Sequence, residues 1–101
     1  MSVPDPLEES QRLKAESDQA RLDFIKTDLA TCLTLADLAE TEFGLGNTEH
    51  AERTVAKAEK GYSNMLRFFS EATGMTAEVA RELQSQFRDV RERLDALHLL
   101  R

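Results

Sequence analysis

A long stretch without helix breakers is the feature that most constrains the fold of this chain of 101 residues. Both prolines lie at positions 4 and 6, and the first glycine is Gly44, so residues 7–43 contain neither residue type. Pro and Gly are the residues that interrupt helices most strongly. Asp5 can act as an N-cap acceptor, and Pro6 suits the first helical position. The sequence therefore predicts a helix over residues 6–43, roughly 57 Å long at 1.5 Å per residue.

Three ribbons of apolar side chains each lie on one face of a helix. The first two alternate three-four spacings throughout, and the third does so from its second member onward. Their members are Leu22, Ile25, Leu29, Cys32, Ala36, Ala39 and Phe43; Ala51, Val55, Ala58, Tyr62, Met65, Phe69 and Ala72; and Val79, Ala80, Leu83, Phe87, Val90, Leu94 and Leu97. Gly44 and Gly46 separate the first ribbon from the second, and Gly74 separates the second from the third.

The ribbons predict one all-α domain over residues 1–101, an up-down-up three-helix bundle with a long first helix. Its helices are expected at about 6–43, 48–72 and 77–98. The second helix is long enough to reach back only to about residue 20 of the first. The first turns, with few apolar residues such as Leu7 and Leu13, are therefore expected to form a solvated overhang.

The charge distribution argues against nucleic-acid and membrane partners. The net charge is −6. Residues 1–45 hold ten acids against four bases, a net of −6, so the remaining residues balance. An acidic surface repels phosphate backbones and anionic lipid. Since the chain has no run of about 18 apolar residues and no basic, apolar leader, we expect a cytoplasmic location.

Residues 35–58 resemble a single tetratricopeptide repeat, a helix-turn-helix unit of about 34 residues. The matching positions are Leu35, Leu38, Ala39, Gly46, Ala51, Val55 and Ala58. The resemblance implies a closely packed helical hairpin, and it covers about a quarter of the chain. Glu42 stands where the family prefers a large side chain, Ser63 replaces its usual proline, and a generic helical hairpin is the alternative. The peptide groove of the family needs several stacked units, so none of its binding residues is carried over.

Candidate chemical groups favour structural roles. His50, in the first turn of the second helix, is predicted to be solvated. Asp95 and His98 form half of a di-iron pattern that needs a second such pair, so no metal or other cofactor is expected. Cys32, the only cysteine, belongs to the first apolar ribbon, where burial raises the pKa of a thiol.

Charged residues of the third helix are predicted to form a salt-bridged surface rather than a phosphate or RNA contact. Spacings of four residues pair Asp89 with Arg93 and Arg91 with Asp95. Arg81, Gln84 and Arg88 lie beside the apolar ribbon, where neighbouring acids reduce the positive potential.

Gly61 is the unusual residue of the second helix, because an internal glycine costs about 1 kcal/mol relative to alanine. It predicts either a close crossing with the third helix or another chain, or a local bend. Phe68 lies on the same side one heptad later. On the first helix, Phe24, Leu35 and Leu38 lie about 100° from the main ribbon.

These side chains lead to a functional hypothesis. We expect a noncatalytic interaction or scaffold module, homodimeric, that uses the overhang or the Gly61–Phe68 flank. The alternative is a small-ligand-binding bundle or a regulatory subunit of an enzyme, with a pocket beside Phe24, Leu35 and Leu38.

Overall fold

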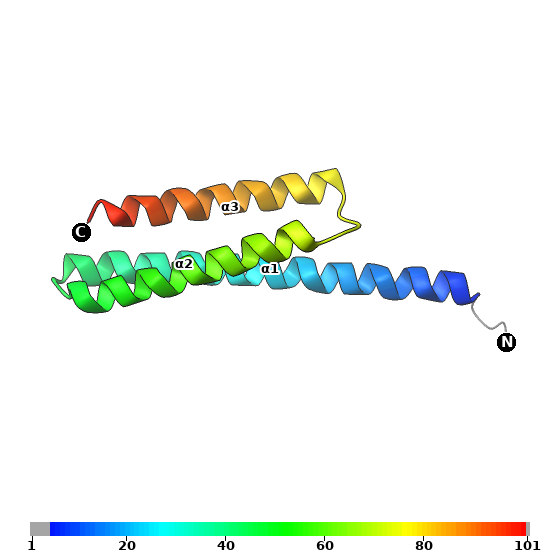
Figure 1. Cartoon of the computed structure of the whole chain (residues 1–101), viewed down its shortest axis with the longest axis horizontal. Coiled ribbons are helices and arrows are strands. Elements are labelled where there is room, and N and C mark those ends of the chain that lie inside the picture. Colours follow the sequence, from blue (N-terminus) through cyan, green and yellow to red (C-terminus); the bar gives the residue numbers. More distant parts are fainter. Residues whose placement is uncertain (1–4, 101) are drawn as a thin grey trace.

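The computed structural model describes residues 5–100, except for the side chains at positions 14 and 15. This range folds into three α-helices, α1 (Pro6–Gly44), α2 (Thr48–Glu71) and α3 (Ala77–His98), as Figure 1 shows. The prediction of an all-α chain with three helices is confirmed.

Side-chain caps begin the first and third helices. The carboxylate of Asp5 accepts a hydrogen bond from the backbone N–H of Leu7 at 3.2 Å, and Pro6 follows as the first helical residue. The Thr76 hydroxyl accepts one from the N–H of Val79, also at 3.2 Å. Both caps satisfy N–H groups that the first turn of a helix leaves without an intrahelical partner.

The turn between α1 and α2 depends on a left-handed glycine. Gly46 has a φ of 78°, and its N–H donates to the carbonyl of Phe43 at 3.0 Å. The next N–H, of Asn47, donates to the carbonyl of Glu42 at 2.9 Å. These two bonds form a Schellman motif, which satisfies the last carbonyls of a helix and reverses the chain.

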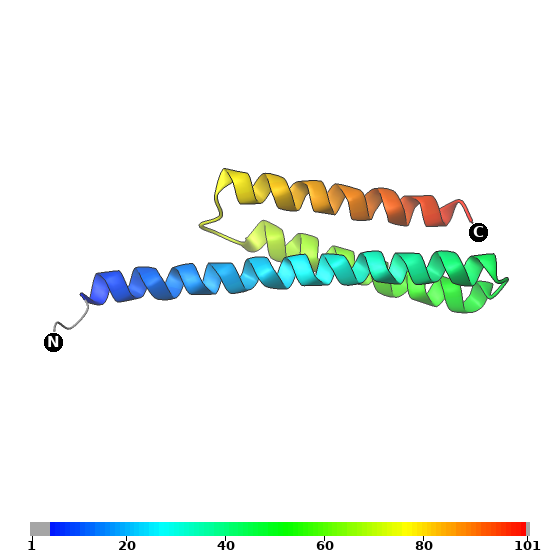
Figure 2. The ribbon, with the colours of Figure 1, turned by 180° about the vertical axis from the view of Figure 1, so that it is seen from behind.

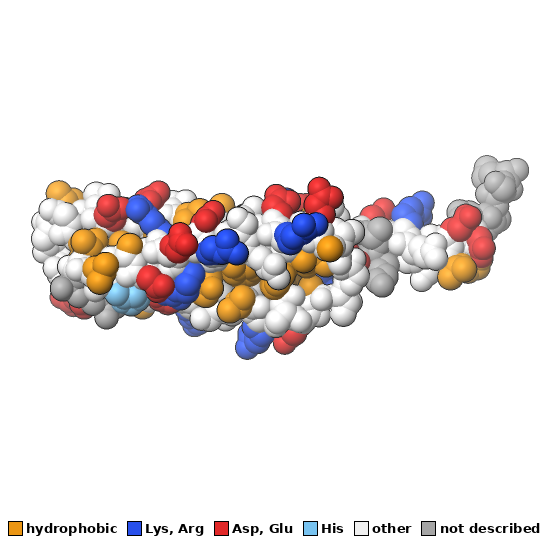
Figure 3. Space-filling model, turned by 90° about the horizontal axis from the view of Figure 1, so that it is seen from above, with side chains coloured by type: hydrophobic (Ala, Val, Ile, Leu, Met, Phe, Trp, Pro, Cys, Tyr) orange, Lys and Arg blue, Asp and Glu red, His pale blue; other side chains and the backbone are white. Residues whose placement is uncertain are grey.

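The helices lie side by side over most of their length. Cys32 of α1 contacts Ala58 of α2. Lys26 pairs with Glu82, and Arg93 pairs with Asp37 farther along, so residue numbers rise together in α1 and α3. Figures 1 and 2 show α2 running back along α1 from the turn, and α3 along the pair. The molecule is elongated, 66 × 24 × 17 Å, as the space-filling view in Figure 3 also shows.

The core lies where the three apolar ribbons meet. Its buried members are Ile25, Leu29, Cys32, Ala36, Ala39, Val55, Ala58, Met65, Leu83, Phe87, Val90, Leu94 and Leu97. The α1 and α2 ribbons bring many small residues to this core, whereas α3 brings mainly large ones. The hairpin of α1 and α2 is therefore close-packed, and α3 covers it with larger side chains.

The N-terminal part of α1 extends beyond the other helices, as both ribbon views show. Leu7 and Leu13 are 64% and 56% exposed there. The expected overhang is thus present in the structure. None of the three helices in residues 5–100 combines the length and the hydrophobicity that crossing a membrane requires.

The turn offers a matched pair of glycine substitutions. Gly46→Ala should lower the free energy of unfolding by about 1 kcal/mol, because alanine is strained at positive φ. Gly44→Ala should be neutral or stabilising, since Gly44 is helical and a β-carbon there meets no atom within 4 Å. Urea denaturation of both variants measures the difference. Equal effects would contradict the role assigned to Gly46.

Candidate interaction surface

Gly61 lies at a close contact between α2 and α1. A β-carbon at this position would lie 3.1 Å from the Sγ of Cys32. The same sulfur lies 3.6 Å from the carbonyl oxygen of Ala58. The sequence predicted a crossing with the third helix or another chain, or a bend. The neighbour at Gly61 is α1 and not the third helix, and α2 continues through this position from Thr48 to Glu71.

Phe68 and Phe24 lie together at the edge of the α1–α2 contact. Their ring centroids are 5.3 Å apart, and the rings are tilted by 59°. Phe24 remains 47% exposed, as does Leu38 farther along α1. Leu35 is partly buried and packs against the core. The structure thus brings Phe24 and Phe68 into contact, leaves Gly61 half-buried, and exposes Phe24 and Leu38 to solvent.

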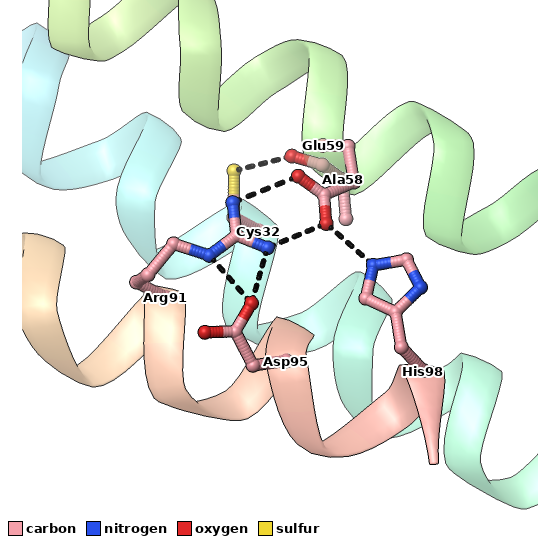
Figure 4. A network of polar contacts seen from close by, with 6 residues as sticks. All are labelled: Cys32, Ala58, Glu59, Arg91, Asp95 and His98. Carbon is pink, nitrogen blue, oxygen red and sulfur yellow. Dashed lines mark hydrogen bonds and ion pairs between the residues drawn. The ribbon is translucent and has the colours of Figure 1, made fainter. Parts of the chain in front are cut away.

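A polar network joins α2 to α3 on another side of α2 (Figure 4). Arg91 donates two hydrogen bonds to Glu59, from Nη1 to Oε2 at 2.9 Å and from Nη2 to Oε1 at 2.7 Å. His98 Nε2 lies 3.0 Å from Glu59 Oε1, and Arg91 Nε donates to Asp95 at 2.9 Å. The Arg91 guanidinium also lies 5.0 Å from the centroid of the Tyr62 ring. This bidentate pair fixes the relative position of the two helices.

The network changes the acidity of its members. The hydrogen bonds from Arg91 lower the pKa of Glu59 from 4.5 to about 2, with burial acting in the opposite direction. The same pair raises the pKa of Arg91. Asp95 and His98, half of the di-iron pattern, take part in this network. Among the described side chains of residues 5–100, no group of three or more His, Cys, Asp or Glu residues could hold a metal ion.

Arg93 links α3 to α1. Its Nη2 lies 2.6 Å from Asp37 Oδ1 and also contacts Glu40. The predicted pairing of Arg93 with Asp89 is wrong, because the α1 carboxylates lie within reach of the same guanidinium. Periodicity within one helix reveals only pairs in that helix, so the sequence pattern missed this contact.

Glu42 carries a buried carboxylate at the turn end of the hairpin. It is 6% exposed, and Thr54 donates a hydrogen bond from Oγ1 to its Oε1 at 2.9 Å. His50 Nδ1 contacts the other carboxylate oxygen. His50 is exposed in the first turn of α2, as predicted, and its contact with Glu42 is a feature that the sequence analysis missed. The four-residue spacing of His50 and Thr54 was the signal that could have revealed the cluster.

Cys32 lies in the core, as the first ribbon predicts, and is 3% exposed. Burial raises the pKa of its thiol, and the nearby Asp28 carboxylate acts in the same direction. A raised pKa keeps a thiol protonated and unreactive at neutral pH. Cys32 therefore acts as a small packing residue against Gly61.

Two hollows lie at helix junctions. One, of about 220 Å³, lies between α1 and the α2–α3 connection, with Leu22, Met75 and Val79 in its wall. The other, of about 290 Å³, lies between α1 and α3 beside Leu33 and Val90. Phe24, Leu35 and Leu38 line neither hollow, so the predicted pocket beside these three side chains does not correspond to either one.

A double-mutant cycle tests the close approach at Gly61. Gly61→Ala gains helix propensity but crowds Cys32, whereas in a Cys32→Ala background the crowding sulfur is absent. The substitution should be more favourable in that background by about 0.5–2 kcal/mol in the free energy of unfolding. Ser63→Ala, on the exposed side of α2, should show no such coupling with Cys32. A coupling of zero at Gly61 would refute the contact.

Acid titration tests the Glu59–Arg91 pair. Because the pKa of Glu59 is lowered in the folded chain, its stabilisation is present above about pH 4.5 and is lost as the pH falls toward 2. Glu59→Gln should reduce the free energy of unfolding at neutral pH by on the order of 1 kcal/mol, since the pair is partly exposed. Wild type and variant should converge near pH 2. Glu52→Gln, at an exposed site on α2, should change little at either pH.

Comparison with known proteins identifies no relative of this chain. No protein-family model matches the sequence, and neither a curated protein nor a solved structure does.

Proposed function

We propose that this chain is a noncatalytic protein–protein interaction or scaffold module that associates with itself. In this proposal it acts in the cytoplasm, without a cofactor, as an up-down-up three-helix bundle with a tetratricopeptide-like hairpin over residues 35–58. The observation that carries the proposal is the exposure of large apolar side chains along one side of α1. Phe24 and Leu38 are both 47% exposed, and Leu13 on the overhang is 56% exposed.

The use of the polar groups supports a binding rather than a catalytic role. Glu59 of α2 bonds to both Arg91 and His98 of α3. Arg93 is shared between two carboxylates of α1, and Glu42 bonds to Thr54 within the hairpin. In each case the charge stabilises the contact between helices. The apolar side of α1, in contrast, has solvent-facing side chains whose burial in a complex would be favourable.

A small-ligand-binding function, or a regulatory role in an enzyme complex, is the alternative. The hollow of about 220 Å³ beside Leu22, Met75 and Val79 favours it, because its wall combines apolar side chains with Asp18 and Arg21. Its volume suits only a small ligand. A ligand in this hollow should protect residues 72–76 from hydrogen exchange, whereas self-association through α1 should protect residues along α1.

Sedimentation equilibrium over low- to high-micromolar concentrations tests self-association. The average mass of the wild type should rise with concentration above that of one chain. Leu38→Lys should weaken association about tenfold, because it places a charge in the apolar contact. Leu66→Lys is the matched control, since Leu66 is 43% exposed on α2 and should have no effect. A single-chain mass at every concentration would refute self-association.

A further inference from the structure

One exposed side of α1 carries an uninterrupted stripe of uncharged residues. Its members alternate three and four positions apart along the whole helix, and all are exposed. They are Pro6, Ser10, Leu13, Ser17, Ala20, Phe24, Thr27, Thr31, Thr34, Leu38, Thr41 and Leu45. Elsewhere on α1 charges are frequent, at 13 of the 39 residues of the helix, and none falls on this stripe. Solvent exposure alone does not require such a pattern.

Three of the four threonine hydroxyls of the stripe are already hydrogen-bonded within the helix. Thr31 donates from Oγ1 to the carbonyl of residue 27, Thr34 to that of residue 30, and Thr41 to that of residue 37, each at 3.1 Å. A hydroxyl that is satisfied in this way does not need water. Burial of these threonines against another helix would therefore cost little, and the stripe can act as an apolar surface.

The spacing of the stripe is that of a coiled-coil seam. An average repeat of 3.5 residues keeps side chains facing a partner helix when the two helices supercoil with a left hand. The core ribbon lies on the opposite side of α1, so both faces of the helix can be used at once. We propose that the partner on this stripe is a second copy of this chain, with the two α1 helices parallel and in register. This inference rests on the proposed self-association and specifies its geometry.

Charge on the two edges of the stripe carries the argument for the second copy. One edge is acidic, with Glu9, Glu16 and Asp23 each seven residues apart. The other edge has Arg21 and Asp28, seven residues apart, and then the side of α2 that holds Phe68. There, Arg53, Lys57, Lys60 and Arg67 are all exposed. Glu49 and Glu71 lie only at the ends of this basic row. The stripe is thus bordered by acids on one side and mainly by bases on the other.

Symmetry decides how these edges meet. A two-fold axis parallel to α1 brings the acidic edge of one copy against the basic edge of the other. An antiparallel pair requires an axis perpendicular to the helices, which places acidic edge against acidic edge. The parallel arrangement puts Glu16 opposite Arg21 of the second copy, at the usual offset of five residues, and does so twice. The same offset places Asp23 opposite Asp28 of the second copy, and this like-charge pair opposes part of that attraction.

The same arrangement gives the overhang a neighbour. In a parallel pair the two N-terminal segments lie side by side as a two-stranded coil with Leu13 and Ala20 in its seam. An isolated helical segment of about 15 residues is only marginally stable in water. Pairing would bury Leu13, Phe24, Leu38 and Leu45 against their own copies. These are the four large apolar side chains of the stripe.

Disulfide cross-linking tests the geometry on the full chain. Leu13→Cys and Thr31→Cys should each form a disulfide-linked dimer rapidly under mild oxidation, because each residue meets its own copy. Gln11→Cys, on the other side of the overhang, and the wild type, whose Cys32 is buried, should remain largely unlinked. A mixture of the Leu13→Cys and Thr31→Cys chains that links preferentially to each other would establish an antiparallel pair and overturn the proposal.

A charge swap gives an independent readout. Arg21→Glu should weaken the dimer about tenfold, because two attractive pairs become repulsive. Adding Glu16→Arg to that chain should restore most of the affinity in a parallel dimer. Failure of the second change to restore it would contradict the parallel register. A wild-type dimer with the wrong cross-links refutes this geometry alone, whereas a wild type that stays monomeric at all concentrations refutes self-association as well.

Discussion

The close contact of α1 with α2 is the constraint on which the rest of the structure depends. Four alanines at this contact, Ala36, Ala39, Ala51 and Ala58, have no exposed surface. Beside them the absent side chain of Gly61 leaves room for Cys32. Small side chains allow two helix backbones to approach closely, and adding a methylene group there would destabilise the contact by overpacking. The hairpin therefore presents a narrow, continuous surface. The larger leucine, valine and phenylalanine side chains of α3 pack against it.

Ion pairs at the margins of this core specify the position of α3. Glu59 of α2 pairs with Arg91, while Asp37 and Glu40 of α1 pair with Arg93, so two sides of the same turn of α3 are tied to different helices. Partly exposed pairs contribute little stability on average. Their geometry is nevertheless demanding, because a bidentate guanidinium–carboxylate contact tolerates little sliding. Apolar packing thus stabilises α3 on the hairpin, and the arginines select one register among several that similar leucines could satisfy.

The sequence predicted the structural features that depend on residues close to one another along the chain. The Asp5 and Thr76 caps, the glycine turns and the three ribbons follow from local chemistry, and the helix ends lie within one residue of the expected ones. Contacts between helices were harder to predict from the sequence. Arg93 had an acid four residues before it in the sequence, yet two carboxylates of α1 lie within reach of it. Glu42 departs from a family pattern, and only the fold reveals that Thr54 and His50 contact its buried carboxyl oxygens.

The two faces of α1 differ in a way that follows from helix geometry. A straight helix has 3.6 residues per turn, so a row with a strict 3.5-residue repeat drifts by about 20° per heptad. On the core face, short neighbouring helices can follow this drift with irregular mixtures of alanine, leucine and isoleucine. On the exposed face the row remains uncharged for the full length of α1, including the overhang, which neither α2 nor α3 reaches. Only a partner as long as α1 itself could use the whole row, and a second copy of α1 has that length.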